Sequence, residues 1–221
     1  MKRFLLLLLT LVLSLTFVAC NTENDQTSSE TSSETLPIEV KEFGYSLENG
    51  YIHYSIILHN PNEDKAIELP TFRITARDEA NAVLASEEQT LSIIYPKQDF
   101  AYAFLAFEVE KEPKTVDVEV LELDDYKIKN VSVLDNPEYN PLVAINTAYR
   151  TDKIVGEIQN NNNYDIDNGV ISIIFKDDAG KIIGGTSTFI DSIKANSATP
   201  FDVAIYEKFA TDNFEVYANI W

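Results

Sequence analysis

Apolar and polar residues alternate along most of the chain beyond residue 37, with the period of two that a half-buried β-strand produces. The clearest run is residues 51–59. One face of that run carries Ile52, Tyr54, Ile56 and Leu58, and the other carries His53, Ser55 and His59. Turn residues separate such runs, and no helical period of adequate length is present. The pattern predicts an all-β protein.

The order of the predicted strands occurs twice, at an offset of about a hundred residues. In the first copy the main strands are 51–59, 71–76, 83–85, 91–95, 101–107 and 116–120. In the second copy they are 153–159, 170–175, 182–184, 189–193, 201–206 and 214–220. Short strands with turn signals at this spacing are typical of a β-sandwich. We predict two tandem immunoglobulin-like β-sandwich domains, residues 37–130 and 131–221, with residues 131–134 as a strand of either one.

The N-terminus has a different pattern. Met1-Lys2-Arg3 is basic, and residues 4–19 are apolar except for Thr10, Ser14 and Thr16. This run is shorter than the ~20 residues of a membrane-spanning helix. A basic start, an apolar stretch and a small residue before the cleavage point describe a secretory signal peptide, here residues 1–19.

Cys20 is the only cysteine, and it follows the small residue Ala19 directly. The run Phe17-Val18-Ala19-Cys20 resembles the lipobox of bacterial lipoproteins, although Phe17 stands where that family usually has leucine. The resemblance implies that Cys20 is acylated and becomes the mature N-terminus, anchored at the extracytoplasmic face of the cell membrane. Two acyl chains are enough for stable anchoring. The alternative is an ordinary secretory signal with an incidental cysteine.

Residues 21–35 read NTENDQTSSETSSET and contain no apolar side chain. Such a segment cannot bury enough apolar surface to offset its ordering entropy. We therefore predict that residues 20–36 are the lipidated cysteine and a flexible linker. A site of glycosylation or wall contact is the alternative reading of this segment.

The charge excludes several partners. The chain has 17 Lys+Arg and 36 Asp+Glu, and without Lys2 and Arg3 the balance is 15 against 36, a net charge of −21. This argues against nucleic acid and against adsorption to anionic lipid. With one cysteine, no disulfide can form within the chain.

Four runs in the second half form a recognisable set: Gly156-Glu157-Ile158-Gln159-Asn160-Asn161, Val170-Ile171-Ser172-Ile173-Ile174-Phe175, Asp177-Asp178-Ala179-Gly180-Lys181 and Pro200-Phe201. With these runs the second half resembles the FxLYD-type immunoglobulin-like domains of bacterial surface lipoproteins. In the signature itself only Asp177 matches. The first half matches less well, because the turn at Asp78 lacks the glycine. The resemblance implies an extracytoplasmic binding or spacing module without catalytic machinery.

Residues for catalysis are scarce. His53 and His59 are the only histidines, and six residues along one strand place them ~20 Å apart, too far to share a metal. We expect both on a solvent-facing strand face. No catalytic triad, zinc set or phosphate loop is recognisable. We expect no enzyme and no cofactor.

Two weaker signals remain. Asn163, Asp165 and Asp167 have the alternate spacing of a calcium loop, but Asn168 and Ile174 stand at the positions where an EF-hand needs glycine and glutamate. A turn-forming loop is the simpler interpretation, with Asp124-Asp125 as a still weaker metal candidate. Tyrosines near strand ends either form a contact surface or line the core rim: Tyr95, Tyr102, Tyr126, Tyr139 and Tyr164.

Together these observations predict a lipid-anchored, extracytoplasmic binding or scaffold protein of the bacterial cell envelope. Its expected partners are the membrane, through Cys20, and an envelope protein or carbohydrate. The alternative is a ligand- or calcium-binding accessory or sensor subunit of a membrane transporter or envelope enzyme.

Overall fold

Antiparallel β-strands form nearly all the regular structure of the described residues, which are 35–205 and 213–221 in a computed structural model. For residues 104 and 105 only the backbone is described. The predicted signal peptide, Cys20 and the predicted linker as far as residue 34 lie outside the described residues. Within the described part, no helix has the length and apolarity needed to cross a membrane.

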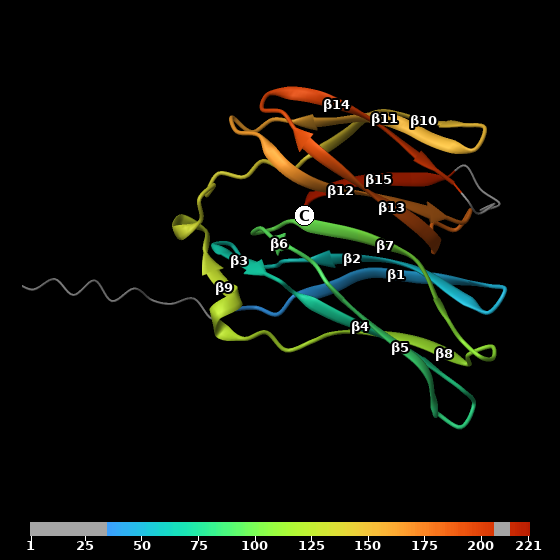
Figure 1. The fold of residues 1–221 in the computed structure, drawn as a ribbon. Coiled ribbons are helices and arrows are strands. Elements are labelled where there is room, and N and C mark those ends of the chain that lie inside the picture. Colours follow the sequence, from blue (N-terminus) through green and yellow to red (C-terminus); the bar gives the residue numbers. More distant parts are fainter. Residues whose placement is uncertain (1–34, 206–212) are drawn as a thin grey trace, which may run out of the picture. The chain divides into compact units, whose positions relative to one another are not determined.

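The strands of the first half pair only with one another (Figure 1). Three sheets result, with the strand orders β1-β2-β7, β5-β4-β8 and β6-β3-β9. We call these nine strands the first sandwich. Their bounds are β1 (Glu39–Glu48), β2 (Tyr51–His59), β3 (Lys65–Glu68), β4 (Thr71–Arg77), β5 (Val83–Thr90), β6 (Ile93–Ile94), β7 (Asp99–Glu108), β8 (Thr115–Val120) and β9 (Ile128–Asn130).

The second half forms two sheets, with the orders β10-β11-β14 and β13-β12-β15. We call these six strands the second sandwich. Their bounds are β10 (Val143–Arg150), β11 (Lys153–Asn160), β12 (Ile166–Lys176), β13 (Ile182–Ile193), β14 (Ser197–Ala204) and β15 (Phe214–Ile220). The all-β prediction is confirmed, and the immunoglobulin-like topology stays a prediction.

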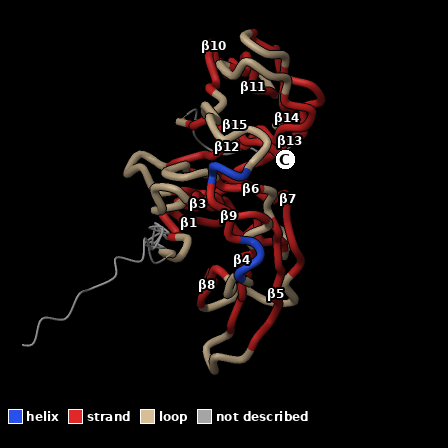
Figure 2. The backbone as a smooth tube through the Cα atoms, turned by 90° about the vertical axis from the view of Figure 1, so that its left-hand side faces the viewer, coloured by secondary structure: helices blue, strands red, loops and turns tan. Residues whose placement is uncertain are grey.

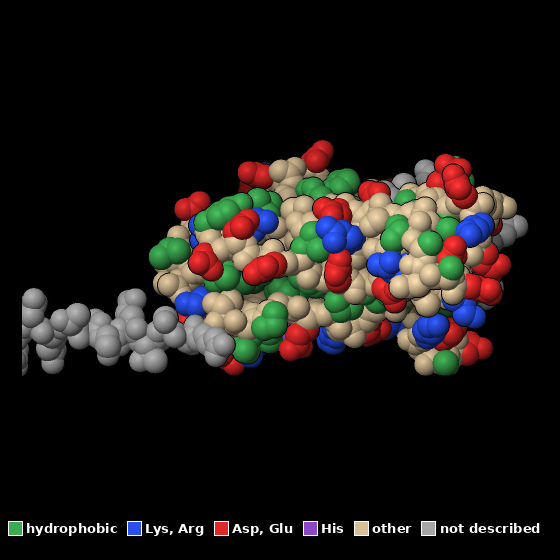
Figure 3. All heavy atoms as spheres, turned by 90° about the horizontal axis from the view of Figure 1, so that it is seen from below, with side chains coloured by type: hydrophobic (Ala, Val, Ile, Leu, Met, Phe, Trp, Pro, Cys, Tyr) green, Lys and Arg blue, Asp and Glu red, His purple; other side chains and the backbone are tan. Residues whose placement is uncertain are grey.

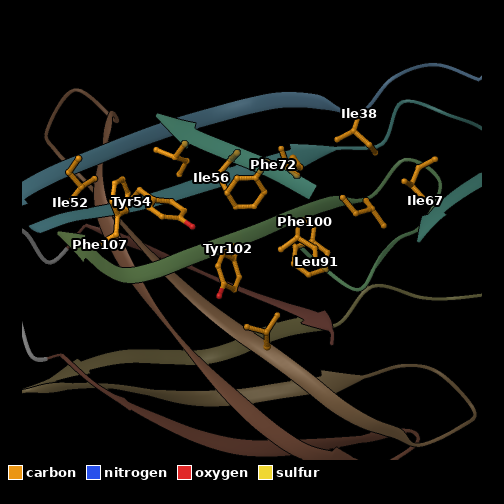
Figure 4. Packing of buried hydrophobic residues seen from close by; sticks show 14 of the residues in the cluster. Ile38, Ile52, Tyr54, Ile56, Ile67, Phe72, Leu91, Phe100, Tyr102 and Phe107 are labelled. Carbon is orange, nitrogen blue, oxygen red and sulfur yellow. The ribbon is translucent and has the colours of Figure 1, made fainter. Parts of the chain in front are cut away.

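Each sandwich has an apolar core, and the core of the first also contains Val170 of β12. In the first, alternate residues of β2 and β7 point towards β4, and Tyr54 meets Phe72 edge-on with ring centroids 6.0 Å apart (Figure 4). In the second, Ile173 is fully buried beside Ile171 and Phe175. The alternation read from the sequence therefore places the core side chains of both sandwiches.

Some predicted elements differ. Residues 131–134 are not a strand, because Val131–Val133 form the 3-10 helix η2, which follows a similar turn, η1 (Asp125–Lys127), after β8 (Figure 2). The separate strands predicted at 182–184 and 189–193 are one strand, β13. The predicted strand at 91–95 shortens to β6.

A buried asparagine pair closes one end of the first sandwich. Asn60 donates from Nδ2 to the carbonyl oxygens of Lys65, Ile94 and Tyr95, at 2.8, 3.0 and 3.1 Å. Its Oδ1 accepts both the backbone N–H and the side-chain N–H of Asn62. Asn62 in turn exchanges two hydrogen bonds with the backbone of Leu36. These amides satisfy backbone groups that no strand pairs with.

The second sandwich has the same network. Asn160 donates to the carbonyl oxygens of Tyr164 and Ile193 at 3.0 and 3.1 Å, and its Oδ1 accepts from Asn162. Asn162 exchanges two hydrogen bonds with the backbone of Asn140, as Asn62 does with Leu36. The two halves therefore share a hydrogen-bond network as well as a strand order.

The charged turns also correspond. Asp78 Oδ1 accepts from the backbone of Ala80 and Ala82, and Asp177 Oδ1 accepts from Ala179 and Lys181. The left-handed position of the turn is held by Gly180 at φ 78° in one turn and by Asn81 at φ 63° in the other. The missing glycine after Asp78 therefore does not change the turn, because asparagine tolerates the left-handed region.

The outer face of the β5-β4-β8 sheet is polar and exposed, with basic and acidic side chains interspersed (Figure 3). Arg73 on the central strand pairs with Glu88 at 2.5 Å and Glu119 at 2.9 Å. Exposed pairs of this kind contribute little stability, about 0–1 kcal/mol each. The face is consistent with a solvated surface.

We predict that Asn160→Ala lowers the free energy of unfolding by about 2–4 kcal/mol, because it leaves several buried backbone groups without a partner. The matched control is Asn161→Ala, whose exposed side chain bonds to nothing in the described chain and should change stability by less than about 0.5 kcal/mol. Denaturant unfolding of both variants measures the difference. Equal effects would contradict the structural role of Asn160.

Candidate functional site at the junction of the two sandwiches

The second face of β2 is covered by the second sandwich. Every residue of β2 from Ile52 to Leu58 is buried, whereas alternation alone predicts that His53 and Ser55 face solvent. That expectation is wrong for His53, whose exposed fraction is 8%. The reason is that the β1-β2-β7 sheet packs against β12 and β13, so both of its faces are buried (Figure 1).

Small residues allow this close packing. A four-residue apolar cluster, Ile57, Ala101, Ile174 and Ile182, fills the interface and packs against Tyr217. Gly44 on β1 lies against β13, where an added Cβ would overlap the Ile182 carbonyl oxygen and lie 2.6 Å from the Ile182 Cβ. Any side chain at residue 44 would push the two sheets apart.

Polar side chains complete the interface. Gln98 Nε2 donates to Asn219 Oδ1 at 3.2 Å, and Asn219 Nδ2 donates to the Ala101 carbonyl oxygen at 3.3 Å. The Ala103 backbone N–H donates to Ser187 Oγ at 3.2 Å. Asn219 is 2% exposed, so its amide is fully committed to these contacts. These groups are paired as burial requires, whereas Ser55 Oγ, on the face of β2 that meets β13, is buried without a hydrogen-bond partner in the described residues.

Lys176 bridges the two sandwiches. Its Nζ lies 3.0 Å from Glu42 of β1 and 3.1 Å from Glu215 of β15, and its side chain is largely buried. Burial opposes ionisation of Glu215, but hydrogen bonds from Tyr217 and Lys176 outweigh it and hold the pKa of Glu215 below its ordinary value. For Lys176, burial acts to lower the pKa, and the two carboxylates raise it overall.

His59 occupies a second charged cluster. Its Nδ1 lies 2.7 Å from Asp99 Oδ1, and Asp99 Oδ2 pairs with Lys41 Nζ at 2.5 Å. The hydrogen bond with Asp99 raises the pKa of Lys41. His59 is therefore partly buried and bonded to Asp99. The sequence predicted a solvent-facing histidine.

The tyrosines near strand ends belong mostly to the core rim. Tyr95 and Tyr102 are buried, at 8% and 6% exposure, so they do not form an exposed contact surface. Tyr95 stacks on Tyr139 with ring centroids 4.3 Å apart, and Tyr102 stacks on Trp221 at 5.5 Å. Of the five candidates, Tyr126 is the one with a largely exposed side chain.

A groove of about 350 Å³ lies beside this junction. One wall is the segment that joins the two sandwiches, and the other is the loop between β11 and β12. The two hydrogen bonds between Asn162 and the Asn140 backbone tie the walls together. The lining residues are Asp135, Asn136, Pro137, Glu138, Asn140, Asn161, Asn163 and Tyr164.

The polar side chains of this groove are not used by the fold. The side chains of Asn136, Asn140, Asn161 and Asn163, with Asp135 and Glu138, make no hydrogen bond or ion pair to the residues that the structure describes. Tyr164 Oη is buried and also has no hydrogen-bond partner there, and burial raises the pKa of Tyr164 to about 12. The groove thus collects donors and acceptors that no other group of the described chain uses, and among them Tyr164 Oη is the buried atom without a partner.

The three calcium candidates have different surroundings. Asn163 lines the groove, Asp167 is an exposed residue of β12, and Asp165 accepts from Lys194 Nζ at 2.7 Å and from the Ala195 backbone at 2.9 Å. Lys194 and the Ala195 N–H hold the pKa of Asp165 below its ordinary value. Asp124 lies 4.0 Å from Lys127 and is exposed. No group of three or more His, Cys, Asp or Glu side chains in the described residues is placed to hold a metal.

Sequence reasoning singled out Asn163 and Tyr164 but missed the other groove residues. The run Asn160-Asn161-Asn162-Asn163 was a usable signal, because a strand-end turn does not need four amides. The contribution of residues 135–140 depends on how the two sandwiches are joined, which strand periodicity does not report.

These features define an all-β protein of two sandwich-like halves with a polar groove at their junction. No family model matches the chain, and no curated protein matches it.

We predict that Gly44→Ala destabilises the protein by about 1–3 kcal/mol, because the added methyl group overpacks the interface. The control is Ser46→Ala, two residues along the same strand, which adds no volume. Thermal unfolding and small-angle scattering together test the expectation of a lower Tm with a larger radius of gyration. A Gly44→Ala protein that matches Ser46→Ala in both would contradict the close packing.

Acidification should weaken the same interface. Since the pKa of Glu215 is lowered by folding, its contribution to stability is complete above its ordinary value of 4.5 and is lost as pH falls through the lower folded value. Glu215→Gln should therefore lose less stability than the wild type between about pH 7 and about pH 3. Urea unfolding at both pH values measures this. Exposed Glu48→Gln is the control, and it should follow the wild type.

Proposed function

We propose that the chain is a lipid-anchored, extracytoplasmic binding or scaffold protein of the bacterial cell envelope, built from two tandem immunoglobulin-like sandwiches. The observation that carries the proposal is the position of Cys20. The single cysteine directly follows a signal-like apolar segment and a small residue, where acylation requires it. A polar segment of fifteen residues, 21–35, then leads to the first strand at Glu39.

The arrangement of the body supports a binding role. Its two sandwiches share a buried interface with apolar, hydrogen-bonded and charged contacts, which favours one rigid unit over two modules on a loose hinge. A rigid unit presents its surface in a fixed geometry, and preorganisation of that kind lowers the entropy cost of binding. The acidic charge keeps such a surface off anionic lipid.

A second candidate is an accessory or sensor subunit that binds a small ligand. The groove between residues 135–140 and 161–164 favours it, because ligand sites are concave and lie preferentially where structural units meet. The two candidates share the same anchor and differ in what the folded body contacts.

Cys20→Ala tests the anchor. We expect the variant to appear in the medium or to remain as unprocessed precursor, and to take up no radiolabelled palmitate, because the acylated sulfur is gone. Ser28→Ala in the polar segment is the control and should stay with the membrane and carry label. Palmitate uptake by Cys20→Ala at the control level would refute the lipoprotein assignment.

A further inference from the structure

The two asparagine loops differ in a way that the fold does not require. Asn60 and Asn62 have the same bonds as Asn160 and Asn162, so both loops need asparagine at these two positions. The alternate positions are Pro61 and Glu63 in the first loop and Asn161 and Asn163 in the second. The two extra amides therefore have no structural counterpart.

The first loop also has a lysine bonded to it. Lys97 Nζ donates to the Pro61 carbonyl oxygen and pairs with Glu63, both at 2.7 Å. In the second sandwich the position that corresponds to Lys97 is Asn196, and both residues have a left-handed backbone, at φ 57° and 51°. No lysine stands at this position of the second sandwich, and Asn161 and Asn163 line the groove.

The chemistry of the groove selects a class of ligand. Side-chain amides donate and accept hydrogen bonds without carrying charge, and four of them converge here with two carboxylates and a tyrosine. Asp135 and Glu138 exclude an anion, and the polar walls exclude a lipid chain. Hydroxyl groups can bond to both halves of an amide, and Pro137 and the Tyr164 ring offer apolar area to C–H groups.

We propose that the groove between residues 135–140 and 161–164 binds an uncharged saccharide, with the Asn161 and Asn163 amides as its main hydrogen-bonding groups. A volume of about 350 Å³ is near the lower end of the range for small-molecule sites, so it accepts one or two sugar units of a longer chain. This inference adds a class of ligand to the binding role proposed above. It depends on that proposed function only for the location of the protein at the cell envelope.

The test is calorimetric titration of the full mature protein in detergent with three oligosaccharides: maltotetraose, cellotetraose and the tetramer of N-acetylglucosamine. We expect at least one of them to bind with a micromolar to millimolar Kd. The double variant Asn161→Ala/Asn163→Ala should bind that sugar about tenfold or more weakly, because two hydrogen-bonding amides are lost. Its melting temperature should equal that of the wild type, since neither side chain is bonded within the fold.

The matched control is Pro61→Ala/Glu63→Ala in the first loop, which should leave sugar affinity unchanged. Three results would overturn the proposal: no binding of any of the three sugars at millimolar concentration, binding that the groove variant leaves unchanged, or a heat of binding from calcium chloride alone that the groove variant abolishes. The last result would assign the groove to a cation. All three are independent of palmitate uptake, so failure of the sugar site and failure of the anchor are distinguishable.

Discussion

The structure depends on a pair of buried asparagines at one end of each sandwich. Backbone groups at a strand end have no ladder partner, and a buried polar group without a partner costs about 1–3 kcal/mol. Asn60 and Asn160 supply those partners from one side chain each, and Asn62 and Asn162 extend the network to the segment that enters the sandwich. The incoming segment, the strand end and the following loop are thereby held together. In the second sandwich the same bonds also fix both walls of the groove.

The interface between the sandwiches adds a second constraint. A sheet buried on both faces needs residues that serve two cores, and β2 does so with Tyr54 on one side and Ile57 on the other. Close approach requires Gly44, Ala101 and serines in place of larger side chains. The largely buried charge of Lys176 is acceptable because carboxylates from both sandwiches neutralise it. The packing and the charge pairs therefore favour the same placement of the two sandwiches relative to each other.

The sequence was sufficient for strands and cores but not for contacts between the two halves. Periodicity located β2 and β4 because a core on one face imposes alternation. It misplaced His53, because nothing local distinguishes a face that meets solvent from one that meets another sheet with small and polar residues. The missing glycine in the turn at Asp78 made the first half look less similar to the second than it is. The turn needs a left-handed backbone at residue 81, and Asn81 adopts it as Gly180 does in the other turn. The groove could not be predicted, since one wall is the joining segment.

Function is best sought where a residue type exceeds what the fold demands. In the run of residues 160–163, the even-numbered asparagines are buried and fully bonded, and the odd-numbered ones are exposed and bond to nothing in the described chain. The first loop shows that the fold accepts proline and glutamate at the odd positions, because its own network is intact with Pro61 and Glu63. The four consecutive asparagine side chains of this loop thus have two different physical roles. Only Asn161 and Asn163, which the fold does not use, are available to a ligand. Comparison with the first loop of this internal repeat distinguishes the two roles.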